Sequence, residues 1–145
     1  MKDIDVLTGD VVDVALRIHR DLGPGLLESV YETVLAGNLY DMGYMVDRQK
    51  PIDIEFEGRR FDAAFRIDLL VDNRLLIEIK SVDALSKALM KQMQTYLRLT
   101  NQHVGLLINF AGATLREGLK RVVNEHVPSA SSRLRVNQSG FAGTR

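Results

Sequence analysis

Apolar side chains recur every three or four positions over the first forty residues, which is the spacing of helices that bury one face. The first run predicts a helix that begins after Asp10, a candidate N-cap. Its apolar members are Val11, Val14, Ala15, Ile18 and Leu22. Gly23-Pro24-Gly25 interrupts the pattern, and a second helix is predicted from Leu27 to Met42, with Gly43 as its carboxy-terminal cap. Two helices therefore precede any strand.

Beyond Met45 the apolar period shortens to two, which is the period of β-strands. The first alternating run ends at Glu57-Gly58, which reads as a turn. The apolar members of the three runs are Ile52, Ile54 and Phe56; Phe61, Ala63, Phe65, Ile67, Leu69 and Val71; and Leu75, Ile77 and Ile79. This pattern predicts an antiparallel meander of three strands.

The remaining pattern predicts a third helix over 84–99, a strand buried on both faces over 104–110, and a short fourth helix over 115–123. The fold class is thus α/β (α+β), in the order α-α-β-β-β-α-β-α, with a central mixed sheet of about four strands flanked by helices. Residues 1–127 are expected to form a single domain. Residues 128–145 are polar, rich in Ser and Gly and without period, which predicts a mobile tail.

The loop between the second and third predicted strands decides which side chains share a face. A two-residue loop, Asp72-Asn73, would place the apolar row before it on the side of the charged residues after it. A three-residue loop, Asp72–Arg74, instead pairs Val71 with Leu75. In that register one face carries all six apolar side chains, Ile67, Leu69, Val71, Leu75, Ile77 and Ile79. The pattern favours the three-residue loop.

This register places Asp68 opposite Glu78, with Lys80 on the same face. Cross-strand β-carbons lie about 4.5 to 5.5 Å apart, so two facing carboxylates repel unless a cation lies between them. Oxygen ligands favour Mg²⁺ or Mn²⁺, and a neighbouring Lys can orient or deprotonate a metal-bound water. The alternative is an ordinary solvated sheet face.

Composition limits the classes of function. The chain has 145 residues, 46% hydrophobic and 26% charged, as expected of one soluble globular domain. Its 19 basic and 19 acidic residues give zero formal charge, so composition alone does not indicate strong attraction to nucleic acid. The absence of cysteine excludes disulfides, thiolate zinc sites and cysteine nucleophiles. No apolar stretch approaches a membrane span of about 18 residues, so we expect a cytoplasmic protein, and a homo-oligomer is compatible with this sequence.

Two motifs point to a known family. Asp68 followed by Glu78-Ile79-Lys80 resembles the D...(D/E)xK signature of the PD-(D/E)xK nuclease superfamily. Gly25-Leu26-Leu27-Glu28-Ser29-Val30-Tyr31 reads GxxExxY and resembles the GxxExxY family of small bacterial proteins within that superfamily. Gln92 with Tyr96, and the run LRLTNQHVGLLINF, agree in order and spacing. The resemblance covers about Val11 to Val123 and implies a restriction-endonuclease-like core.

By this resemblance, Asp68 and Glu78 would bind Mg²⁺ or Mn²⁺, with Glu28 contributing directly or through water. Ile79 would offer its backbone carbonyl, and Lys80 would act on the nucleophilic water. Gln92 would complete the site, so the implied catalytic residues are Glu28, Asp68, Glu78, Lys80 and Gln92. Glu28 as a helix-dipole acid and Gln92 as a buried, satisfied amide remain the structural alternatives.

The resemblance also has departures. Relatives often carry His three residues before Gln92, where this chain has Leu89, and Ile67 replaces the Pro of the superfamily name. The implied function is metal-dependent hydrolysis of phosphodiester bonds in DNA or RNA. A catalytically silent binding or interaction module with the same fold is the alternative, since fold does not fix function, and an assembly component is a third.

Overall fold

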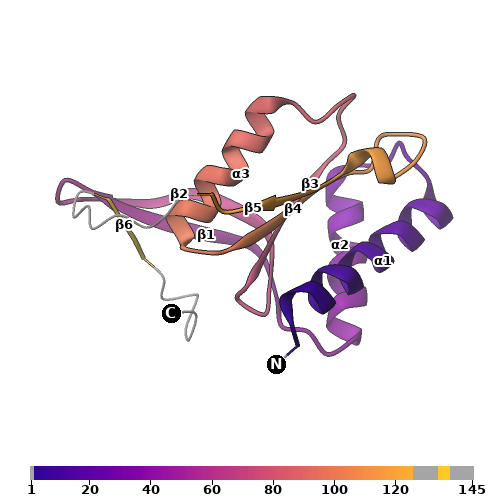
Figure 1. Ribbon diagram of the computed structural model, residues 1–145, viewed down its shortest axis with the longest axis horizontal. Coiled ribbons are helices and arrows are strands. Elements are labelled where there is room, and N and C mark those ends of the chain that lie inside the picture. The colour runs from indigo at the N-terminus through magenta and orange to yellow at the C-terminus, as the bar shows by residue number, and fades with distance from the viewer. Residues whose placement is uncertain (1, 126–133, 138–145) are drawn as a thin grey trace.

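The computed structural model describes residues 2–125 and 134–137, which form a mixed sheet with helices on both faces (Figure 1). The helices are α1 (Ile4–Leu22), α2 (Glu28–Asp41), α3 (Lys87–Thr100) and the 3-10 turn η1 (Arg116–Gly118). The strands are β1 (Val46–Phe56), β2 (Arg59–Val71), β3 (Leu75–Lys80), β4 (Val104–Asn109), β5 (Leu119–Val123) and β6 (Leu134–Asn137). They form one six-stranded sheet in the order β5-β4-β3-β2-β1-β6, in which only β3 and β4 run parallel.

Two apolar cores lie on opposite faces of this sheet. α1 and α2 cover one face and α3 covers the other (Figure 1). The first core takes from β2, β3 and β4 the side chains Leu69, Val71, Leu75, Ile77, Ile79, Val104, Leu106 and Ile108. The second core combines Leu70, Leu76 and Leu107 of the same strands with Met93 and Leu97 of α3. β4 therefore contributes to both cores, which confirms that it is buried on both faces.

The three-residue loop between β2 and β3 is confirmed. Val71 pairs with Leu75 and Leu69 with Ile77. Asp72 and Asn73 have φ values of 52° and 54°, a left-handed conformation that Asp and Asn tolerate better than most residues. One side chain departs from the predicted row, because Ile67 packs in the core beneath α3. It lies beyond the last pair of the β2–β3 ladder, where strict alternation across two strands no longer holds.

Two helices begin at other residues than predicted. α1 does not begin after Asp10, because Asp3 caps it and accepts a hydrogen bond from the backbone N–H two residues later (2.7 Å). The fully buried Leu7 extends its apolar stripe toward the amino terminus. α3 begins after Ser86, whose side chain accepts from a backbone N–H in the first turn (3.2 Å), rather than at Ala84.

The predicted fourth helix over 115–123 is wrong. A 3-10 turn is followed there by strand β5, which pairs antiparallel with β4. The apolar spacing of this short segment suits either element, and strand pairing decides between them. Gly118 allows the reversal into β5, because a side chain there would place its Cβ 2.2 Å from the carbonyl oxygen of Asn109. The sheet consequently has more strands than the predicted four.

Part of the predicted tail belongs to the sheet. Residues 134–137 form β6, which pairs antiparallel with residues 53–56 of β1. The remaining tail residues lie outside the described part of the chain. Among the described helices, none has both the length and the apolar character that crossing a membrane requires.

Candidate active site

The carboxylates of Asp68 and Glu78 meet where β2 and β3 stop pairing. The backbone N–H of Asp68 donates to Glu78 Oε2 (2.8 Å), and the backbone N–H of Ile79 donates to Asp68 Oδ2 (2.8 Å). Two side chains thus replace the backbone ladder and hold the diverging strands together. The predicted neighbours therefore lie side by side, each oriented by the opposite strand. Each carboxylate offers about four lone-pair positions, so these bonds leave acceptor capacity free.

Glu78 is unusually buried for a carboxyl group, with only 4% of its surface exposed. Burial, and next the negative charge of Asp68, raise the pKa of Glu78 to about 7, while the Asp68 N–H and the Lys80 charge act in the opposite direction. Near neutral pH the pair therefore retains a proton for part of the time. A divalent cation would relieve the same repulsion, so the electrostatics of the pair favour cation binding.

Glu28 lies at the first residue of α2 and reaches the end of β3. Its Oε2 accepts a hydrogen bond from the backbone N–H of Ser81 (2.7 Å), the residue directly after Lys80. The contact brings the predicted helical acid to the edge of the site, although its carboxylate bonds to backbone there instead of joining the Asp68–Glu78 pair. A favourable interaction with the helix dipole alone does not explain why the Glu28 carboxylate connects α2 to the end of β3.

Tyr31 fixes the loop that precedes Glu28. Its hydroxyl donates to the carbonyl oxygen of Gly23 (2.6 Å) and accepts from the backbone N–H of Leu26 (3.1 Å). Its ring stacks on Phe110 with a centroid distance of 4.2 Å. The tyrosine of the GxxExxY pattern thus fixes the loop that leads into α2, and the glutamate of the pattern is the first residue of that helix.

Tyr31→Phe should lower the free energy of unfolding by about 1 kcal/mol, because it removes both hydroxyl contacts and keeps the ring stacking. Urea denaturation measures the change, with Tyr40→Phe as the control because Tyr40 is 72% exposed. Equal stability of Tyr31→Phe and wild type would show that the hydroxyl does not secure the loop.

Lys80 follows Glu78 by two residues on β3, and its charge favours the ionised form of that glutamate. The side chain is partly buried. Within the described part of the chain, no acceptor binds its amine. Lys80 is therefore available to a water or a phosphoryl oxygen beside the two carboxylates.

Gln92 lies exposed on α3, one turn before Tyr96. Exposure rules out the reading of Gln92 as a buried amide. Tyr96 stacks on Phe65 at 4.2 Å, and burial, followed by the charges of Glu78 and Asp68, raises the pKa of Tyr96. The face of α3 that carries Tyr96 is thus within electrostatic range of the carboxylates, while Gln92 itself touches neither.

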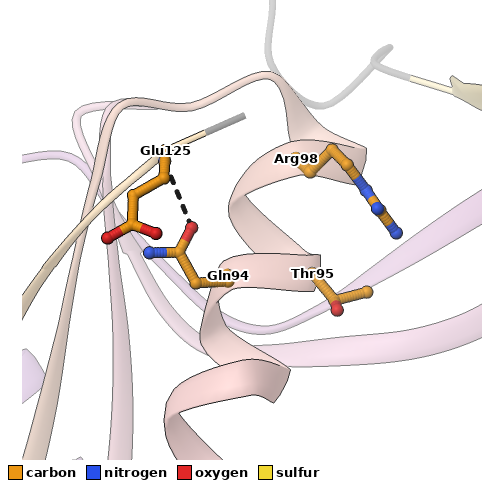
Figure 2. Close-up of a pocket in the computed structure, with 4 residues that line it drawn as sticks. All are labelled: Gln94, Thr95, Arg98 and Glu125. Atoms are coloured by element: carbon orange, nitrogen blue, oxygen red, sulfur yellow. Dashed lines mark hydrogen bonds between the residues drawn. The ribbon is translucent and has the colours of Figure 1, made fainter. Parts of the chain in front are cut away.

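A separate pocket of about 270 Å³ lies beside the carboxy-terminal half of α3, lined by Gln94, Thr95, Arg98 and Glu125 (Figure 2). The Gln94 amide is already engaged, because it donates to the carbonyl oxygen of Val123 (2.7 Å) and accepts from the backbone N–H of Glu125 (3.2 Å). These bonds attach the end of β5 to α3. The pocket contains none of the predicted site residues, and its polar contacts serve the fold.

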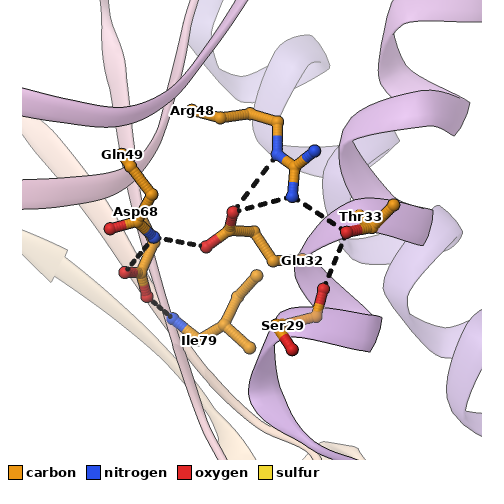
Figure 3. Close-up of polar contacts among 7 residues, drawn as sticks. All are labelled: Ser29, Glu32, Thr33, Arg48, Gln49, Asp68 and Ile79. Carbon is orange, nitrogen blue, oxygen red and sulfur yellow. Dashed lines mark hydrogen bonds and ion pairs between the residues drawn. The ribbon is translucent and has the colours of Figure 1, made fainter.

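A polar network that the sequence did not predict lies behind Asp68 (Figure 3). Glu32 of α2 is 7% exposed and accepts from Arg48 Nη2 (3.0 Å) and Nε (3.2 Å). Gln49 Nε2 donates both to Glu32 Oε1 (2.6 Å) and to Asp68 Oδ1 (3.1 Å). One signal was available, since Glu32 lies four residues after Glu28 and therefore on the same helix face. Nothing in the strand pattern distinguished Arg48 or Gln49.

The donor set suits a hard cation with few protein ligands. Among residues 2–125 and 134–137, no group of three or more His, Cys, Asp or Glu is arranged to hold a metal ion. Mg²⁺ commonly binds through one or two carboxylates and retains several waters, so Asp68 and Glu78 with the Ile79 carbonyl fit that chemistry.

A family model described as the PD-(D/E)XK nuclease superfamily matches residues 5–122, well over half of the chain. The matched range includes Asp68, Glu78 and Lys80. No curated protein and no solved structure matches.

Proposed function

Because the chain belongs to the PD-(D/E)XK nuclease superfamily, we propose that it is a metal-dependent nuclease that hydrolyses phosphodiester bonds of DNA or RNA. The mixed sheet with helices on both faces is consistent with a restriction-endonuclease-like fold, so the predicted fold class is confirmed. The observation that carries the proposal is the pair of crossed carboxylates, Asp68 and Glu78, with Lys80 close enough for its charge to favour the ionised form of Glu78.

In this proposal Asp68, Glu78 and the Ile79 carbonyl would hold Mg²⁺ or Mn²⁺. The ion, when bound, polarises a phosphoryl oxygen and lowers the pKa of a coordinated water. Burial of Glu78 keeps bulk water from screening its carboxylate, which strengthens its interaction with a cation. The backbone N–H donors of Asp68 and Ile79 fix the two side chains before the cation arrives, so little rearrangement is needed.

Lys80 acts on the nucleophilic water. Its amine would orient that water and balance the negative charge that develops on the phosphoryl oxygens in the transition state. The Glu28 carboxylate reaches from α2 to the end of β3, where the Ser81 N–H orients it. There it would bind a metal-coordinated water. Gln92, exposed on α3, would contact the substrate.

The direct test is cleavage of end-labelled single- and double-stranded DNA and RNA by the purified protein at pH 8. Cleavage is expected with Mg²⁺ or Mn²⁺ and should stop when EDTA is added and resume when excess metal is restored. Calorimetry with Mn²⁺ on the same preparation reports metal binding independently of cleavage.

Metal binding without cleavage of any of the four substrates would contradict the nuclease proposal and favour the binding module. Mn²⁺ binding that survives Glu78→Ala would place the metal elsewhere. The narrower assignment to the GxxExxY family belongs to this proposal too, and rests on the contacts of Glu28 and Tyr31 described above.

A further inference from the structure

Gln49 has an unusual backbone conformation for its place in the chain. It lies within β1, yet its φ is 50°, in the left-handed region that is costly for residues other than glycine. The side chain is exposed, so burial of apolar surface does not compensate for this cost. Strained backbone of this kind persists where the surrounding structure holds it, and it is frequent at functional sites.

The Gln49 amide connects two carboxylates. Its Nε2 donates to Glu32 Oε1 (2.6 Å) and to Asp68 Oδ1 (3.1 Å) (Figure 3). Ionised carboxylates only accept hydrogen bonds, so the NH₂ end of the amide, which has two donors, is the end that can serve both. Asp68 is then held from two sides, by Gln49 at Oδ1 and by the Ile79 N–H at Oδ2.

Glu32 is itself anchored, which makes it a fixed support for Gln49. Arg48 contacts Glu32 Oε2 through two guanidinium nitrogens, and its Nη2 also donates to Thr33 Oγ1 (2.8 Å). Glu32 thus uses one oxygen for the neighbouring cation and presents the other to the amide (Figure 3). These hydrogen bonds link Arg48 to Glu32, Glu32 to Gln49, and Gln49 to Asp68.

We infer that Gln49 is a positioning residue of the active site, which holds Asp68 in the orientation that receives the metal ion and is itself oriented by Glu32 and Arg48. The inference rests on the proposed function for its link to the metal. Its structural part, the fixing of Asp68 by the Gln49 amide, applies to the metal-free protein as well. Partners that orient metal ligands typically change metal affinity or activity about 10- to 100-fold when they are lost.

Gln49→Gly separates the amide from the backbone conformation, because glycine adopts positive φ without strain. Glu57→Gly is the matched control, since Glu57 is exposed, also has a φ of 50° and lies in the β1–β2 turn. Glu57→Gly should keep or slightly raise the melting temperature, and in Gln49→Gly the relief of backbone strain should offset the two lost amide contacts, so its melting temperature should stay near that of wild type. Only Gln49→Gly should weaken Mn²⁺ binding, by about 10-fold in calorimetry, and lower kcat while KM for nucleic acid stays the same.

Amide hydrogen exchange of the metal-free protein gives the readout that is independent of catalysis. The Ile79 amide, which donates to Asp68, should exchange several times faster in Gln49→Gly than in wild type or Glu57→Gly, while Leu106 in β4 should be unchanged. Unchanged exchange at Ile79, or equal acceleration at Leu106, would overturn the inference. If the Ile79 amide exchanges faster in Gln49→Gly but wild type neither binds Mn²⁺ nor cleaves nucleic acid, the positioning of Asp68 is supported. Only the nuclease proposal is then contradicted.

Discussion

Lys80→Ala is expected to lower kcat for Mg²⁺-dependent cleavage by about 10²- to 10⁴-fold, the usual contribution of a positioned proton-transfer or charge-stabilising group. Lys80 follows Glu78 by two residues on β3. Because the described residues offer its amine no hydrogen-bond acceptor, removal of the amine breaks no contact of the fold. Melting temperature should therefore change little. Initial rates on a labelled substrate at saturating Mg²⁺ measure the effect.

Lys120→Ala is the matched control, because Lys120 is an exposed lysine on β5 of the same sheet. Its rate should equal that of wild type. Equal cleavage by wild type and Lys80→Ala preparations would indicate a contaminating nuclease and would contradict the role of Lys80. A loss of cleavage accompanied by a large fall in melting temperature would instead indicate a structural role.

The core of the site could be predicted because strand register follows from local pattern. Of the two loop lengths compared, only the three-residue loop Asp72–Arg74 puts the apolar positions of the two strands on one face, and that loop is observed, with Ile67 alone packing on the other face. The same register places the acidic residues side by side. The pattern could not predict that the backbone ladder ends at Leu69 and Ile77, or that the carboxylates of Asp68 and Glu78 continue the contact in its place.

Other parts depend on contacts between segments far apart in the chain. The segment over 119–123 is apolar at spacings that suit a helix, but the open edge of β4 pairs with it as a strand. Gln49 and Glu32 come from a strand and a helix, and only the assembled fold brings them to Asp68. The spacing of Glu32 from Glu28 placed it on the same helix face, but nothing in the sequence linked either Glu32 or Gln49 to Asp68, since each supports the site through another side chain.

The fold brings several carboxylates close together at one place, where they repel each other. Asp68, Glu78 and the anchored Glu32 bring negative charge to the point where two strands diverge, and both Asp68 and Glu32 contribute to the raised pKa of Glu78. Without a cation, this arrangement is destabilising at pH values where Glu78 ionises. The stability of the metal-free protein therefore reports on the site directly.

Glu78→Gln should stabilise the metal-free protein at pH 8 by up to about 3 kcal/mol while abolishing Mg²⁺-dependent cleavage. The pKa of Glu78 is about 7 in the fold against a reference value of 4.5, so between these values the folded state binds more protons than the unfolded state. Its contribution to stability is therefore fully present below about pH 4.5 and is lost as the pH rises through about 7. Glutamine keeps a side-chain oxygen to accept the Asp68 N–H and has no charge to bury.

Urea denaturation from pH 4.5 to pH 8, with and without Mg²⁺, measures this prediction against Glu117→Gln, an exposed control in η1. Wild type and Glu78→Gln should have similar stability at pH 4.5 and diverge toward pH 8. Mg²⁺ should then stabilise wild type and the control at pH 8, because it binds the folded state, and leave Glu78→Gln unchanged. A parallel pH dependence in all three proteins would mean that Glu78 ionises normally in the fold, and Mg²⁺ stabilisation of Glu78→Gln would remove that residue from the metal site.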